Sequence, residues 1–108
     1  MSESHLVRSI LLAYGTSPTI RLFRQNTGVG VGLKHSGVIS FGLCKGSSDI
    51  IGIKSPEGRF IALECKMKPR KATPEQVQFL LMVDRMGGIA ACVYSLEDCF
   101  AVLGRPTK

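Results

Sequence analysis

Residues 49–66 read DIIGIKSPEGRFIALECK, and this stretch predicts a β-hairpin. Positions 49–53 are mostly β-branched and apolar, which favours a strand. The SPEG sequence at 55–58 predicts the turn, because proline presets φ at its second position and glycine relaxes its exit. Positions 60–66 then predict a second strand that runs back antiparallel to the first. Apolar residues on both sides of this strand predict burial on both of its faces.

Charged residues lie at one end of the predicted hairpin. A fold about residue 57 sets position 49 opposite position 65, so Asp49 has Glu64 and Lys66 as its nearest cross-strand neighbours. Glu64 and Lys66 are two positions apart and therefore share a face. Because an unpaired charge in a buried strand is costly, these groups favour a shared site over an ordinary surface Glu–Lys pair. Carboxylate oxygens are ligands that Mg²⁺ prefers, so the hairpin predicts a metal site.

The composition is typical of one small globular domain. The chain has 108 residues, of which 44% are hydrophobic and 20% charged, enough for a single core. It shows neither an apolar run of membrane-spanning length nor a signal pattern, so a cytoplasmic protein is expected. The four cysteines lack C-x-x-C spacing and the two histidines are far apart, which favours reduced thiols over a zinc site. The net charge of +6 favours a polyanionic partner.

Residues 2–14 predict an amphipathic helix, because apolar residues recur along one face. These residues are Leu6, Val7, Ile10 and Tyr14. Glu3 lies in line with them, one turn earlier. Beside an N-cap at Ser2, its carboxylate complements the helix dipole, and on the residues alone this role is favoured over a place in the site.

Glycines dominate the segment between this helix and the hairpin. Residues 19–27 are expected to be extended, 28–37 to form a flexible loop and 38–41 to form a short strand. The loop is not a P-loop, because Lys34 is not followed by serine or threonine. The small residues of 42–48 would let a phosphate approach the backbone closely.

The part after the hairpin predicts a basic loop, two helices and a strand. The basic loop is 67–71, with four cations counting Lys66, and its position next to the acidic residues favours phosphate binding over simple solvation. The TPEQ sequence at 73–76 predicts a capping box that starts a helix running to about Met86. Gln76 could either cap this helix or reach into the site. Residues 89–94 predict a buried strand parallel to a neighbour, and 96–103 a last helix capped by Ser95.

The predicted order of elements, αβββαβα, resembles the PD-(D/E)XK nuclease superfamily. This resemblance implies an α/β, restriction-endonuclease-like fold with a central mixed sheet flanked by helices. More narrowly, the chain resembles the VRR-NUC (virus-type replication-repair nuclease) family, as a single domain over residues 1–108. The motifs that carry the resemblance are RQNTG (24–28), FGLCKGSSDIIG (41–52), ECK (64–66) and TPEQ (73–76). Ser48 stands where the superfamily name has proline, which is usual among VRR-NUC relatives.

The resemblance implies a metal-dependent DNA endonuclease. It implies that Asp49, Glu64 and the backbone carbonyl of Cys65 hold Mg²⁺ or Mn²⁺. Lys66 would orient or deprotonate the attacking water. The family pattern also implies that Glu3 is a metal-binding carboxylate and that Gln76 contacts the site.

Stand-alone members of the family occur in phages and bacteria and resemble homodimeric Holliday-junction resolvases, while a fused relative acts in DNA repair. The expected partners are therefore branched DNA, such as a four-way junction, and a second copy of the chain, with no membrane. The expected place is the bacterial or phage-infected cytoplasm, at the nucleoid. The alternatives are a monomeric flap or nicking nuclease and a non-catalytic nucleic-acid-binding module. The residues expected to hold DNA are Arg21, Arg24, Asn26, Lys34, Lys45, Lys68, Arg70 and Lys71.

Overall fold

The structure is a computed structural model, and it describes residues 2–25, 28–31, 38–41 and 43–106. In chain order the helices and strands are α1 (Glu3–Ala13), β1 (Ile20–Arg24), β2 (Gly28–Val31), β3 (Val38–Phe41), β4 (Ile50–Lys54), β5 (Arg59–Cys65), α2 (Pro74–Arg85), β6 (Ile89–Val93) and α3 (Leu96–Leu103).

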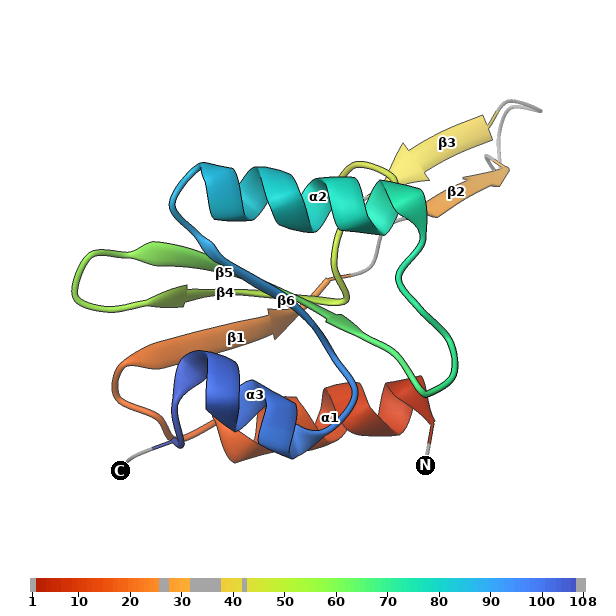
Figure 1. Ribbon diagram of the computed structural model, residues 1–108. Helices are drawn as coiled ribbons and strands as arrows, with labels where there is room; N and C mark the ends of the chain where they lie inside the picture. Colours follow the sequence, from red (N-terminus) through yellow and green to blue (C-terminus); the bar gives the residue numbers. More distant parts are fainter. Residues whose placement is uncertain (1, 26–27, 32–37, 42, 107–108) are drawn as a thin grey trace.

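A mixed sheet of four strands, in the order β1-β4-β5-β6, forms the centre of the fold. Its first three strands are antiparallel, and β6 is parallel to β5. Helix α2 covers one face of the sheet, while α1 and α3 cover the other (Figure 1). The predicted α/β class and the order αβββαβα are therefore confirmed, with the hairpin β2–β3 added between β1 and β4. In the described part of the chain, no helix is both long and apolar enough to cross a membrane.

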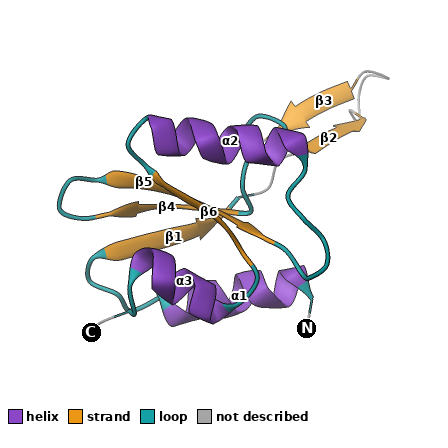
Figure 2. Ribbon diagram, viewed as in Figure 1, coloured by secondary structure: helices purple, strands orange, loops and turns teal. Residues whose placement is uncertain are grey.

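The hairpin β2–β3 extends away from this sheet, beyond the start of α2 (Figures 1 and 2). The prediction of a loop over 28–37 was wrong for 28–31, which is a strand. Gly30 pairs with Ile39 in an antiparallel ladder, and this ladder gives backbone groups partners despite the low strand propensity of glycine. The short strand expected at 38–41 is confirmed.

The sheet separates two cores of different size. The larger core lies between the sheet and α1 with α3, and it contains the four apolar residues predicted for the first helix. The smaller core lies between the sheet and α2, with Ala62, Phe79, Leu80 and Val83. Strand β5 serves both, since residues 61–65 are all buried, as predicted. Strand β6 is parallel to β5 as predicted, but of its residues only Val93 is fully buried, because β6 is an edge strand.

The hairpin 49–66 forms, but its register differs from the predicted one by one residue. Ile50 pairs with Leu63, which brings Asp49 opposite Glu64 and not opposite Cys65. The physical reason lies in the turn. Residues 55–58 form a four-residue connection closed by the N–H of Gly58, so the hairpin folds between positions 56 and 57.

This shift decides which side chains can meet. Side chains directly opposite each other in an antiparallel pair lie on the same face, and a slip of one residue moves a side chain to the other face. The predicted register would have set Asp49 on the face of Cys65. Asp49 lies one residue before the first pair of the observed ladder, Ile50 with Leu63, so the same register places it on the face of Glu64. This is the face that α2 covers.

Candidate metal centre

Asp49, Glu64 and Lys66 come together where β4 begins and β5 ends. Asp49 directly precedes β4, and its Oδ2 accepts a hydrogen bond of 2.9 Å from the backbone N–H of Cys65. Lys66 directly follows β5, and its Nζ lies 3.8 Å from Oε2 of Glu64. The side chains of Lys66 and Glu64 are only 4% and 3% exposed. The predicted combination of two carboxylates and one amino group is therefore present at one end of the two central strands, where Glu64 and Lys66 are buried.

The carboxylate of Glu64 is only half satisfied. Its Oε2 accepts a hydrogen bond of 3.0 Å from Nε2 of Gln76 and also faces Lys66. Its Oε1 is buried and has no hydrogen-bond partner among the described residues. A buried polar atom without a partner costs about 1–3 kcal/mol, and in native proteins such an atom is commonly explained by an ion or a water.

The electrostatics of Glu64 agree with this geometry. Burial raises the pKa of Glu64 to about 8, the negative charge of Asp49 and a hydrogen bond with its carboxyl group add to the rise, and the charge of Lys66 opposes it. A carboxyl group with such a pKa is largely protonated at neutral pH when no cation is present. A divalent cation beside the two carboxyl groups would favour their charged forms, so the site is electrostatically suited to one.

Gln76 performs both of the roles that the sequence left open. Its Oε1 accepts from the backbone N–H of Thr73 at 2.8 Å, and Oγ1 of Thr73 accepts from the N–H of Gln76 at 3.3 Å, which completes the capping box. At the same time its Nε2 donates to Glu64. One amide side chain thus connects the start of α2 with the candidate metal ligand.

The described residues contain no cluster of three or more His, Cys, Asp or Glu side chains placed to hold a metal ion. Two neighbouring carboxylates nevertheless suit Mg²⁺, which usually keeps several waters and takes further oxygen ligands from substrate, while the carbonyl of Cys65 as a ligand stays a prediction. The unpaired Oε1 of Glu64 supports this fit. The thiol of Cys65 does not favour a soft metal, because its burial raises its pKa and keeps it protonated.

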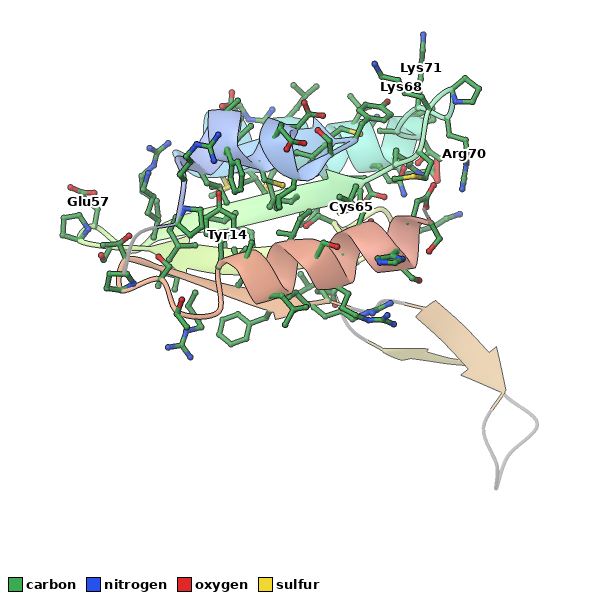
Figure 3. All side chains as sticks on the ribbon, turned by 90° about the horizontal axis from the view of Figure 1, so that it is seen from below. Tyr14, Glu57, Cys65, Lys68, Arg70 and Lys71 are labelled. Carbon is green, nitrogen blue, oxygen red and sulfur yellow. The ribbon has the colours of Figure 1, made fainter. Side chains whose placement is uncertain are left out.

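Glu3 lies at the same end of the molecule, but its charged partner is Arg70. Oε2 of Glu3 accepts from Nη1 of Arg70 at 2.8 Å, and Ser2 caps the helix by accepting from the N–H of His5. Figure 3 shows Arg70 beside the N-terminal end of α1. The structure thus confirms the cap at Ser2, while the role of Glu3 as a metal ligand stays a prediction.

The basic loop after β5 carries exposed cations near the candidate metal centre. Lys68, Arg70 and Lys71 are exposed and gather at one end of the molecule, far from Glu57 in the hairpin turn (Figure 3). Tyr94 supports this loop, because its hydroxyl donates to the carbonyl of Arg70 at 3.0 Å and its ring lies 5.8 Å from Nζ of Lys68. The sequence analysis missed Tyr94. Its available signal was an aromatic residue at the end of the strand expected at 89–94.

The other residues predicted to bind DNA are spread more widely. Arg24 pairs with Ile50 at the site end of the sheet, whereas Arg21 pairs with Ile53, about 10 Å further toward the hairpin turn. Lys45 is exposed and lies 3.8 Å from the carboxylate of Glu75.

Two further positions of that predicted set, Asn26 and Lys34, lie outside the described residues.

A comparison with protein-family models finds no model that matches the chain, and a comparison with curated proteins finds no similar one. The resemblance to VRR-NUC nucleases therefore stays a prediction from the motifs.

Proposed function

We propose that this protein is a metal-dependent DNA endonuclease that hydrolyses phosphodiester bonds. The observation that carries the proposal is the buried, unpaired Oε1 of Glu64 on a carboxylate next to Asp49. A Mg²⁺ or Mn²⁺ ion held by Asp49, Glu64 and the carbonyl of Cys65 would provide the missing partner. When bound, such an ion would polarise a phosphoryl oxygen and lower the pKa of a water.

The protein's own side chains have separate tasks in this proposal. The N–H of Cys65 orients the carboxylate of Asp49, and Gln76 orients that of Glu64. Lys66 is buried beside Glu64, so its amino group is held in place to orient the attacking water or, in its neutral form, to accept the proton of that water. These fixed positions favour reaction, because ordering them at the moment of reaction would raise the barrier.

The substrate we propose is branched DNA, bound mainly through its phosphates. The exposed cations Lys68, Arg70 and Lys71 follow the candidate site directly, and the chain carries a net charge of +6. Such contacts hold the backbone without recognising sequence. Symmetric resolution of a four-way junction needs two paired nicks, so we propose a two-fold dimer of this chain, acting at the nucleoid in the cytoplasm.

The test is cleavage of an end-labelled four-way junction, a flap and a linear duplex in Mg²⁺, in Mn²⁺ and in EDTA. We expect paired nicks in the junction with either metal and none in EDTA. Asp49→Asn should remove cleavage and retain the metal-free gel shift, while the exposed Asp84→Asn should retain both. Single nicks from a monomeric species would favour the nicking nuclease. DNA binding without any cleavage would show a binding module and overturn the proposal.

A further inference from the structure

Gln25 joins the end of β1 to the segment that leads to Asp49. Its backbone N–H donates to the carbonyl of Asp49 at 2.7 Å. Its side-chain Nε2 donates to Oγ of Ser47 at 2.9 Å and to the carbonyl of Ser48 at 3.5 Å. Its Oε1 accepts from the N–H of Leu43 at 3.3 Å. One side chain therefore binds both ends of the segment 43–48.

The same segment is held on its other side by α2. Gly46 has a φ of +87°, and a Cβ atom added there would lie 2.8 Å from backbone atoms of Glu75. Glycine is therefore needed for this close approach to the first turn of α2. Ser48 is buried, and its hydroxyl donates to the carbonyl of Ile50 at 2.9 Å. The segment before Asp49 is thus held between Gln25 and the helix that carries Gln76.

We propose that Gln25 is a positioning residue of the metal centre, which acts by holding the segment 43–48 and thereby the carboxylate of Asp49. The inference rests on the proposed function and deepens it. Residues 43–49 belong to neither a helix nor a strand, so their order depends on such contacts. A ligand that is already held in place does not have to lose conformational freedom when the cation binds, which raises affinity.

The side chain of Gln25 can be tested apart from its backbone. The hydrogen bond from its N–H to Asp49 remains in any substitution except proline, so side-chain variants leave this strand contact in place. Gln25→Ala removes all the side-chain bonds. Gln25→Glu keeps the length and an acceptor for the N–H of Leu43 but loses the donor to Ser47 and Ser48.

The experiment measures Mn²⁺ affinity by calorimetry on the full chain without DNA, and then kcat and KM on the junction. We expect Gln25→Ala and Gln25→Glu to weaken Mn²⁺ binding about tenfold or more, as substitutions behind metal ligands commonly do. The rate constant kcat should fall while KM for DNA stays within about twofold. Gln78→Ala, at an exposed position of α2, is the matched control and should change neither quantity.

The outcomes separate this inference from the proposed function. If the wild type binds Mn²⁺ and Asp49→Asn does not, but both Gln25 variants bind it as the wild type does, the positioning role is overturned and the proposed function stands. A lower melting temperature with unchanged affinity would overturn the positioning role in the same way. If the wild type binds no Mn²⁺, both are overturned. Should Gln25→Ala not fold, as judged by circular dichroism, Gln25→Glu alone decides.

Discussion

The two faces of the sheet bury different kinds of side chain, although they share the same strands. On the face of α1 and α3, strand β5 contributes Ile61, Leu63 and Cys65 to an apolar core. On the face of α2, the same strand contributes Ala62 and then Glu64. Alternation along one strand thus separates a core that stabilises the fold from a smaller one that holds charges. The difference shows that the cost of burying charges is confined to one face, where α2 supplies Gln76 as a partner.

The largest effect is expected from substitutions that remove the charges on the α2 face, and the quantity affected is the rate of DNA cleavage. Asp49→Asn, Glu64→Gln and Lys66→Ala should each lower the rate of DNA cleavage by about 100-fold or more, since in the proposed function each would remove a metal ligand or a group that acts on the water. Circular dichroism and metal-free DNA binding should stay close to wild type. Cleavage within a few-fold of wild type for any one of them would remove that residue from the mechanism.

The next effect concerns the apolar face. Leu63→Ala should lower the free energy of unfolding by about 2–5 kcal/mol, because Leu63 is fully enclosed and leaves a cavity. Leu80→Ala, on the α2 face, is the matched change and should cost less, since Leu80 is 9% exposed and lies in the smaller core. Urea denaturation measures both. An equal or larger loss of stability for Leu80→Ala would show that packing on the α2 face contributes as much to the free energy of unfolding as packing on the opposite face.

Gln76 tests the link between α2 and the charges. Gln76→Ala removes one partner of the capping box and the donor to Glu64, so we expect about 1 kcal/mol of lost stability. We also expect the cleavage rate to fall about tenfold, because the orientation of Glu64 is lost. Thr73→Ala is the control, since it damages the cap but leaves the bond to Glu64. Equal rates in the two variants would leave Gln76 with a capping role alone.

A separate expected effect is a pH dependence of the free energy of unfolding in the absence of metal. The pKa of Glu64 is raised from 4.5 to about 8 in the folded state, so the folded protein holds this proton more tightly than the unfolded chain does. The resulting stabilisation of the folded state is fully present below pH 4.5. This contribution is lost as the pH rises from 4.5 toward 8. In EDTA, the wild type should therefore lose more stability over this range than Glu64→Gln, as followed by thermal melting. Parallel curves for the two proteins would contradict the raised pKa.

Local signals in the sequence were sufficient for most of the helices and strands, although not for strand β2 at 28–31. The caps at Ser2, Thr73 and Ser95 are where the residues predicted them, because a cap involves only a few consecutive backbone groups. The antiparallel direction of β4 and β5 and the parallel direction of β6 were also predictable, since connection length and chain direction largely determine them.

Contacts between distant residues needed the tertiary structure. Three such features are the exact register of the hairpin, the hydrogen bond from Gln76 to Glu64 and the ion pair of Arg70 with Glu3. No local sequence pattern predicts that these residues lie next to each other. The sequence alone was enough to single out Asp49, Glu64 and Lys66 as two carboxylates and an amino group at one end of a hairpin. Their convergence on one face, and the unpaired oxygen of Glu64, were decided by how strands and helix pack, because packing and not composition sets which polar atoms find partners.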